Sequence, residues 1–316
     1  LRTSPGLVPS ERKLLGWTPI SVVGPMGRDV ADTWLQLAAT AGVAPNDPLS
    51  YDFHMPASMD SLGPVDLSRL RVGYTEDFGV CDVDNDIRRV FRKKIASLKG
   101  LFAVCEEVEV DMQHAHRCFD VVRAEAFVGS LQAAYEKDPD ALGPNPRANY
   151  EMGARMSLKD CVWANGEQTR IFRSFQKLFG QYDLILSPTT PVSAFPWEQP
   201  YLTSVNGVEL ENYYRWLALT YVVTLATNPA LSMPMGVDHL SMPFGMQVIG
   251  KFRGDLELLM AAKALEAHCN VTSELSRPTP DLSALAQSDI NLLTPVTHPP
   301  LPPELSGSPA VGRPAV

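Results

Sequence analysis

The chain has 316 residues, of which 45% are hydrophobic, and a formal net charge of -9. This length can hold one large domain or two ordinary ones with a substantial core. The acidic balance offers no basic field to phosphate groups, so nucleic acid is excluded as an expected partner. No apolar run approaches the roughly 18 residues that would cross a bilayer, so no membrane association is expected.

The five cysteines are odd in number and lie far apart in the sequence. Such spacing suits a reducing compartment better than a disulfide framework. We therefore expect free thiols and a cytoplasmic location. The cysteines are Cys81, Cys105, Cys118, Cys161 and Cys269.

In the first half of the chain, helical and strand patterns alternate. Apolar residues recur at helical spacing over 29–41, which predicts an amphipathic helix with Asp29 as its cap. Segments 70–74 and 102–110 have the pattern of strands, and 84–98 between them predicts a helix. A strand, a helix and a strand in this order predict a parallel pair of strands.

The second half continues the alternation. A break that carries proline and asparagine at 139–149 predicts a loop. Segment 210–227, whose only ions are Glu211 and Arg215, is expected to be a helix that is buried on most sides or lines an apolar pocket. The other expected elements are helices over 113–135, 157–179 and 256–268 and strands over 182–188, 230–235 and 244–249.

Strands that alternate with helices predict an α/β fold, with helices on both faces of a mostly parallel or mixed sheet. Beyond Arg277 the chain becomes rich in proline and has little apolar surface to bury. Such a composition cannot offset the entropy of ordering, about 1–2 kcal/mol per residue, so we expect disorder from about Asn291 onward. The expected organisation is one domain over 1–282 and a tail over 283–316.

Two groups of possible metal ligands lack the spacing of a metal site. Asp82, Asp84 and Asp86 have the spacing of the first ligands of a calcium loop. Ile87 occupies the position that needs glycine, and Lys93 occupies the position that needs the final glutamate. In the other group, a helix would turn His116 away from His114 and Cys118, so three zinc ligands do not converge. We expect no metal and no cofactor.

The best-placed polar groups are hydroxyls at the end of the strand predicted over 182–188. Ser187, Thr189 and Thr190 lie where the strands of α/β sheets usually present residues to ligands. The alternative is that these hydroxyls only cap a turn, and the sequence favours neither interpretation. The chain has no Gly-x-Ser-x-Gly elbow, no Gly-rich phosphate loop and no Cys beside an obvious His partner, so we assign no catalytic residue.

Several blocks of the chain follow the order found in one known enzyme family. Together they make the chain resemble amidase signature enzymes from Leu1 to about Leu282. The blocks are LRTSPGLVP at 1–9, VVGPMGRDVAD at 22–32, YDLILSPTTP at 182–191, NPALSMPMG at 228–236, MPFGMQVIG at 242–250 and RPTPDL at 277–282.

The resemblance implies one α/β/α domain around a mixed sheet that is incomplete at its N-terminus here. Family members hydrolyse amide bonds with a Ser, cis-Ser, Lys triad and use no cofactor. By the resemblance, the lysine, both serines and the oxyanion-hole amides all lie upstream of Leu1. A hydroxyl is a weak nucleophile without its base, so we expect this chain alone to be inactive.

The resemblance also implies a pocket for the acyl group on the helix that precedes Pro229. Positions counted back from Pro229 fall at Tyr214, Leu217 and Tyr221, which are all apolar or aromatic. Ordinary core packing at helical spacing is the alternative for these three residues. The predicted substrate-binding residues are Tyr214, Leu217, Tyr221, Thr189 and Thr190.

Three functions remain open. The first is an amidohydrolase that converts a small-molecule carboxamide with an aromatic or aliphatic acyl group into a carboxylate and ammonia or an amine. The second is a fragment similar to the A subunit of glutamyl- or aspartyl-tRNA amidotransferases, which would need partner subunits and tRNA. That A-type protein carries an aspartate at the Leu217 position to hold an ammonium group, and Leu217 cannot form this ion pair. The third is a pseudoenzyme that only binds a ligand, and a homodimer is left open.

Overall fold

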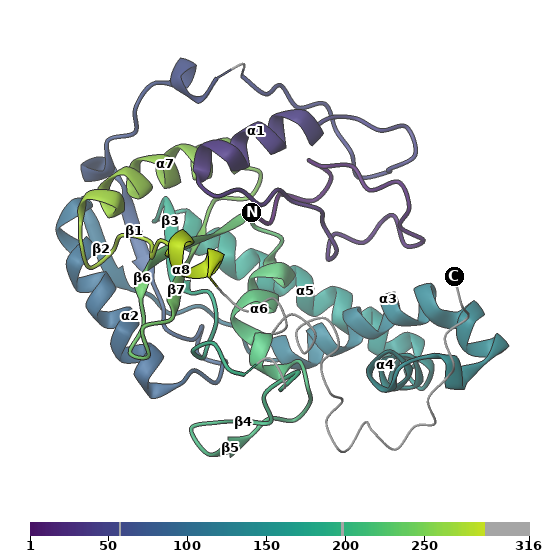
Figure 1. The fold of residues 1–316 in the computed structure, drawn as a ribbon. Helices are drawn as coiled ribbons and strands as arrows, with labels where there is room; N and C mark the ends of the chain where they lie inside the picture. Colours follow the sequence, from purple (N-terminus) through teal and green to yellow (C-terminus); the bar gives the residue numbers. More distant parts are fainter. Residues whose placement is uncertain (57, 197–198, 288–316) are drawn as a thin grey trace.

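The computed structural model describes residues 1–56, 58–196 and 199–287 (Figure 1). In this described part, the centre is a mixed sheet of five strands in the order β2-β1-β3-β7-β6. β1 is parallel to β2 and to β3, which confirms the predicted parallel pair, and β7 is antiparallel to β3 and β6. The strands are β1 (Arg71–Tyr74), β2 (Val104–Glu107), β3 (Leu184–Pro188), β6 (Ala230–Val237) and β7 (Pro243–Ile249).

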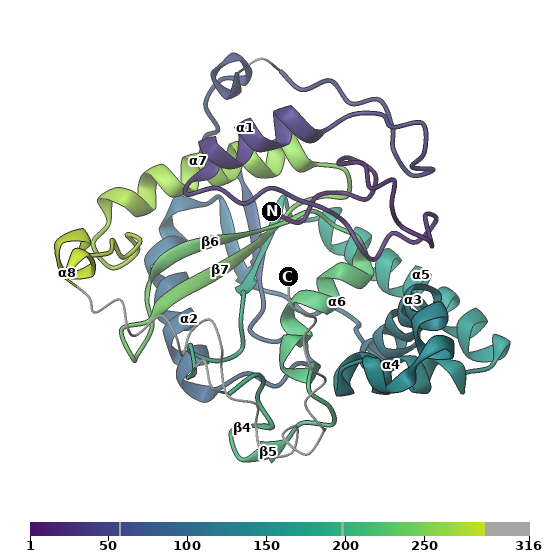
Figure 2. The same cartoon turned by 45° about the vertical axis from the view of Figure 1, so that its right-hand side comes forward.

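Helices cover both faces of the sheet, as the α/β prediction requires. Figures 1 and 2 show α7 and α1 on one side of β6 and β7, and α6 on the other side toward α3, α4 and α5. α2 shares the α7 side, because Lys94 Nζ on α2 donates to the Glu274 carbonyl just after α7, at 2.6 Å. The helices are α1 (Val30–Thr40), α2 (Asn85–Leu98), α3 (Ala115–Lys137), α4 (Pro144–Ala154), α5 (Leu158–Phe179), α6 (Ala218–Ala226) and α7 (Asp255–Val271).

Side-chain caps explain where several helices begin. The Asp29 carboxylate accepts from the backbone N–H of Asp32 at the start of α1, as predicted. Asp84 caps α2 in the same way, and Ser157 and Asp160 form a reciprocal capping box at the start of α5. These polar residues satisfy backbone donors that the first helical turn leaves free.

The loop predicted over 139–149 is wrong, because α4 begins inside it. Pro144 is the first residue of this helix, and Gly143 is its N-cap. Proline is favourable there, since the first helical N–H has no partner within the helix and the ring fixes a helical φ. The proline that signals a break in the sequence thus starts a helix.

The helix predicted over 210–227 is also shorter than expected. A 3-10 turn over Arg215–Leu217 precedes α6, and the residues before it are not helical. The Asn212 side chain accepts from the backbone N–H of Tyr214 at 3.2 Å, which is the local bond by which asparagine competes with a helix.

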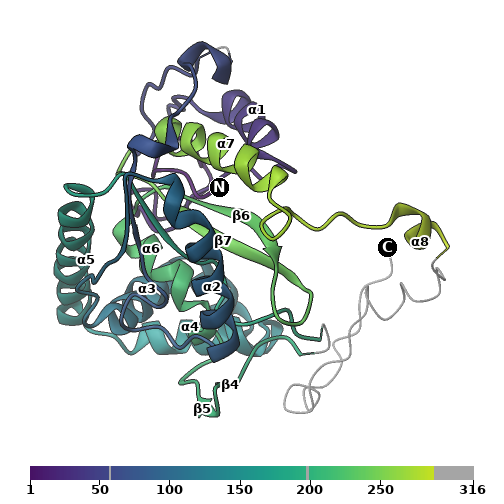
Figure 3. The same cartoon turned by 90° about the vertical axis from the view of Figure 1, so that its left-hand side faces the viewer.

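A short hairpin and a short helix were not predicted. A hairpin of β4 (Ser204–Val205) and β5 (Val208–Glu209) lies between β3 and α6. Figure 3 shows α8 (Leu282–Ala286) apart from the sheet.

Two further expectations concern the tail and the membrane. The expected disorder beyond Asn291 lies outside the described residues. No described helix is long and apolar enough to cross a membrane.

The N-terminal segment is inserted into the fold. Arg2 forms an antiparallel bridge to Ala230 on β6, with backbone N–O distances of 2.7 and 3.0 Å. Its guanidinium donates to the carbonyls of Thr3, Asn228, Pro19 and Thr224 at 3.2–3.4 Å. Burial lowers the pKa of Arg2 to about 10, although the charge of Asp255 opposes this shift.

Candidate functional site

A row of polar side chains crosses the sheet on the face that carries α6. Gln247 on β7 lies between Ser187 on β3 and Ser232 on β6 in the strand register. Residues directly opposite in an antiparallel ladder project to the same face. Gln247 Nε2 donates to Ser187 Oγ at 2.8 Å and to the Leu219 carbonyl of α6 at 3.1 Å. This buried amide therefore fixes α6 on the sheet and shows which face the row occupies.

At the exposed end of this row, two hydroxyls form what we call the hydroxyl pair, Thr189 and Ser232. Their oxygen atoms are 2.9 Å apart, and Ser232 is exposed. Gly245 lies beside both, and a Cβ atom on it would stand 3.1 Å from each hydroxyl oxygen. The pair thus needs glycine at this position of β7.

The start of α6 contributes an uncharged surface. Leu217 is 39% exposed, and the Thr220 hydroxyl one turn later donates to the Leu217 carbonyl at 2.9 Å. Trp216 meets Phe195 edge to face at 5.5 Å between ring centroids. Phe195 belongs to the segment that follows Thr190, so this segment packs against the residues that begin α6.

The two tyrosines predicted for substrate binding are buried in a polar network. Tyr214 and Tyr221 are each 4% exposed. The Tyr214 hydroxyl donates to Asp120 Oδ1 at 2.8 Å, and Tyr221 lies 2.8 Å from Arg215 Nη1 and 2.6 Å from His116 Nδ1. Burial raises the pKa of both phenols. Of the three predicted positions only Leu217 is exposed, and only Tyr221 lies within α6.

Arg215 is the charged centre of this network and is 5% exposed. Its Nη2 atom lies 2.9 Å from Asp120 Oδ2 and 2.7 Å from Glu211 Oε2. Burial alone would lower the pKa of Arg215, but the bonds and charges of Asp120 and Tyr221 hold it above its usual value. The guanidinium therefore stays charged and neutralised below the surface.

Thr190 forms no hydrogen bond with the hydroxyl pair among the described contacts. Its hydroxyl donates to the Val192 carbonyl at 3.2 Å, which is the turn-capping role considered from the sequence. Thr189 instead bonds across strands to Ser232. The sequence analysis did not single out Ser232, Gly245 or Gln247, and only the pairing of β6 with β7 could have placed them beside Thr189.

The arrangement can bind an uncharged group but does not activate a nucleophile. A serine or threonine hydroxyl needs an adjacent base to attack a carbonyl. Among the bonds of the described residues, neither hydroxyl of the pair has a lysine or histidine partner. The described residues also contain no group of three His, Cys, Asp or Glu that could hold a metal.

A large cavity lies elsewhere, between segment 62–70 and the beginning of α7. It has a volume of about 620 Å³, and its wall includes Leu70, Leu184 and Phe252. Leu184 is the first residue of β3, whereas Thr189 follows its last. The cavity and the hydroxyl pair are therefore at opposite ends of this strand.

Comparison with known proteins identifies the family. The family model described as Amidase matches residues 1–259. The A subunit of the glutamyl-tRNA(Gln) amidotransferase from Moorella thermoacetica is 30% identical over 285 residues, which cover 82% of this chain and 56% of the relative. Its counterpart from Novosphingobium aromaticivorans is 30% identical over 271 residues, covering 77% of this chain and 53% of the relative. The chain thus spans about half the length of these relatives.

Solved structures share the fold. A bacterial aryl acylamidase of the amidase signature family has a TM-score of 0.74 at 21% identity, over 84% of this chain and 57% of its own. A 6-aminohexanoate cyclic dimer hydrolase in complex with substrate has a TM-score of 0.68 at 16% identity, over 84% and 59%. At such identities the likeness concerns the fold alone. The family match and the fold together confirm the resemblance seen in the sequence blocks, and the chain belongs to the amidase signature family.

Proposed function

We propose that the complete protein hydrolyses a small carboxamide with an apolar acyl group, and that this chain supplies the wall that binds the acyl group. In this reaction the oxygen of water bonds to the carbonyl carbon, the C–N bond breaks, and the nitrogen leaves with a proton as ammonia or an amine. The observation that carries the proposal is the exposed, uncharged side chain of Leu217 at the start of α6, the helix that Gln247 fixes on the same face of the sheet as the hydroxyl pair.

The charges around this surface support an uncharged acyl group. Arg215 is the nearest charged residue in the sequence, and Asp120 and Glu211 already neutralise it. A charged substrate group placed against Leu217 would lose water without gaining an ionic partner. In the proposal, Leu217 and Thr189 touch the substrate. Tyr214 and Tyr221 hold the segment of Leu217 through their buried bonds, and Thr190 caps the turn after Thr189.

We also propose that this chain alone is inactive. The hydroxyls of Thr189 and Ser232 are hydrogen-bonded to each other, and this bond provides no base. Purified 1–316 incubated with benzamide or acetanilide should release no ammonia or aniline above a heat-inactivated sample. Serine-dependent release by 1–316 would contradict this part of the proposal.

The acyl wall is tested in the product of the complete gene by Leu217→Asp. A carboxylate in the apolar wall should raise the KM for benzamide by about 10-fold or more, because binding would bury it without a partner. The matched control is Leu240→Asp, which introduces the same charge at an exposed leucine in the turn between β6 and β7. Equal effects of the two variants on KM would contradict the assignment of Leu217.

A second candidate function is that of the A subunit of an amidotransferase, because the curated relatives described above bear that name. Leu217 argues against this second function, since a leucine cannot form an ion pair with the ammonium group of glutamine. Release of ammonia from glutamine by the complete protein, with benzamide left intact, would favour this second function over the first.

A further inference from the structure

α3 and α6 are joined by four polar side chains, which we call the α3–α6 clamp. His116 and Asp120 lie four residues apart on α3 and therefore share one face of that helix. Their partners are Tyr221 on α6 and Arg215 in the turn before it. The clamp thus holds both ends of the segment that presents Leu217.

The hydrogen atoms in the clamp can be assigned from its partners. His116 Nε2 lies 2.8 Å from the Val80 carbonyl, which can only accept, so Nε2 carries the hydrogen. In the neutral ring Nδ1 is then an acceptor, and the Tyr221 hydroxyl donates to it at 2.6 Å. Arg215 Nη1 donates to the same phenol oxygen at 2.8 Å. Each hydrogen on these bonds has one acceptor.

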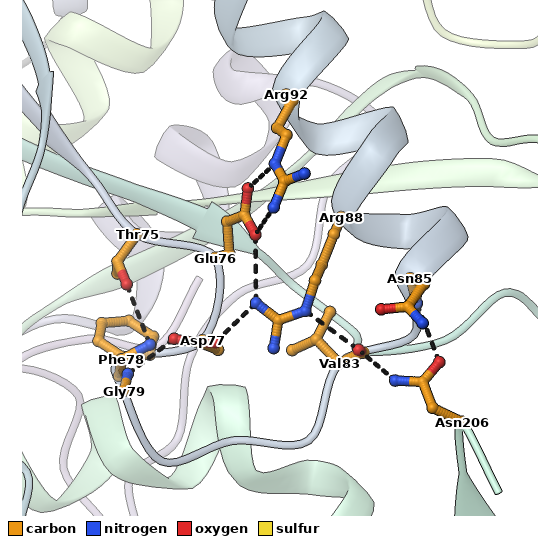
Figure 4. Close-up of polar contacts among 10 residues, drawn as sticks. All are labelled: Thr75, Glu76, Asp77, Phe78, Gly79, Val83, Asn85, Arg88, Arg92 and Asn206. Atoms are coloured by element: carbon orange, nitrogen blue, oxygen red, sulfur yellow. Dashed lines mark hydrogen bonds and ion pairs between the residues drawn. The ribbon is translucent and has the colours of Figure 1, made fainter.

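The anchor of the clamp is a loop that is tied down on several sides (Figure 4). Thr75 Oγ1 accepts from the Phe78 N–H at 3.0 Å, and Asp77 Oδ1 accepts from the Gly79 N–H at 2.8 Å. Glu76, which is buried, forms ion pairs with Arg88 and Arg92 of α2. The Val80 carbonyl therefore belongs to a loop fixed to the sheet and to α2.

Packing closes the clamp around His116. The rings of Phe119 and Tyr221 are stacked, with centroids 4.0 Å apart and planes within 5°. The charged groups that act on the imidazole are Arg215 before α6, Asp120 on α3 and Asp82 in the loop. Tyr221 on α6 is hydrogen-bonded to the ring, and Cys81 in the loop acts on Tyr221. Burial, followed by the charge of Arg215, lowers the pKa of His116.

We propose that His116 is a positioning residue that holds α6, and with it the exposed Leu217, only while its imidazole is neutral. A proton on Nδ1 would remove the acceptor of the Tyr221 hydroxyl and leave that buried hydrogen without a partner. It would also place an imidazolium next to the Arg215 guanidinium. The clamp itself involves no substrate. Only the role of Leu217 in binding the acyl group rests on the proposed function.

The test is hydrogen exchange of 1–316 at pH 7.5 and pH 5.0, with each rate divided by the intrinsic rate at that pH. The protection of α6 should fall on the order of 10-fold at pH 5.0, with a ceiling of ~30-fold set by 1.5 pH units below an ordinary histidine pKa. The protection of α7, on the other face of the sheet, should not fall. An unchanged α6, or an equal loss in α7, would overturn the proposal.

Two variants assign the effect to His116. His116→Gln keeps one donor and one acceptor but does not titrate, so α6 should be equally protected at both pH values. His268→Gln on α7 is the matched control and should retain the pH dependence of the parent chain. A pH-dependent loss that persists in His116→Gln would overturn the proposal. Should that variant fail to fold, Tyr221→Phe, which lacks the hydroxyl that donates to Nδ1, should show a smaller pH dependence than the parent chain, and an unchanged pH dependence would overturn the proposal. These measurements need no substrate, so their failure is distinct from failure to hydrolyse benzamide.

Discussion

Gly245 determines how closely the two exposed hydroxyls can approach each other. The Thr189 N–H donates to the Gly245 carbonyl at 2.9 Å, so the chain after β3 lies directly against this residue. A side chain on Gly245 would stand 3.1 Å from both hydroxyl oxygens, which is tighter than ordinary van der Waals contact. The missing side chain therefore allows Thr189 and Ser232 to bond across β7.

We predict that Gly245→Ala separates the hydroxyl pair and destabilises the chain by about 1–2 kcal/mol, because the Thr189 and Ser232 side chains must move to admit a methyl group and lose their bond. Gly166→Ala is the matched control. Gly166 lies in α5, and a Cβ there meets nothing within 4 Å, so alanine should stabilise the helix by about 0.5–1 kcal/mol. Urea unfolding of both variants measures the two changes, and a stabilised Gly245→Ala would contradict the predicted contact.

For individual residues, the sequence predicts which ones are polar and near a strand end, but not which ones contact each other. Thr189 could be singled out because it follows an apolar strand. Ser232 and Gln247 could not, because their contacts depend on the register of three strands that are distant in sequence. Tyr214 and Tyr221 have the same apolar spacing whether they line a pocket or the core, so their buried network was not predictable from the pattern.

Among the elements, the β4–β5 hairpin depends on one asparagine. Asn206 and Gly207 form its turn with φ values of 52° and 78°, the left-handed conformation that Asn-Gly turns favour. Asn206 Oδ1 accepts from the Asn85 N–H at 3.0 Å, and its Nδ2 donates to the Val83 carbonyl at 2.9 Å. The side chain therefore fastens the hairpin to the start of α2, as Figure 4 shows.

We predict that Asn206→Gly releases the hairpin while leaving the turn itself intact. Glycine adopts positive φ without strain but has no side chain to reach Val83 or Asn85. Exchange of the Val205 and Val208 amides should therefore increase, with little change in the protection of α7. Asn206→Asp should give an intermediate result, because a carboxylate can still accept from Asn85 but cannot donate to Val83. Equal protection in all three proteins would show that these bonds do not hold the hairpin.

The elements themselves were more predictable than their ends. Patterns of apolar residues located α1, α2, β1 and α7, because each buries one face against the core. The errors occurred where one residue type has two structural uses. Proline can end a helix or begin one, and Pro144 begins α4. The hairpin was too short to give a strand pattern.

Across the whole molecule, one connected apolar core runs from Leu7 to Leu275. The N-terminal segment joins this core through Arg2, whose guanidinium bonds to carbonyls more than 200 residues away in the sequence. Burial raises the pKa of Asp255, and the charge of Arg2 opposes this rise. Arg2 thus satisfies buried carbonyls of the chain before β6 and partly compensates a buried carboxylate at the start of α7.

We predict that Arg2→Ala lowers the stability of the entire described fold by about 2–4 kcal/mol, since it leaves buried acceptors unpaired and Asp255 without its nearby cation. Because the core is continuous, tryptophan fluorescence and far-UV circular dichroism should report the same shifted urea midpoint. Arg28→Ala is the control, since Arg28 is exposed and its ion pair with Asp32 lies at the surface, so its midpoint should match that of the parent chain. Separate midpoints from the two probes would instead mean that the N-terminal segment unfolds independently. Equal midpoints for the two variants would show that Arg2 does not stabilise the fold.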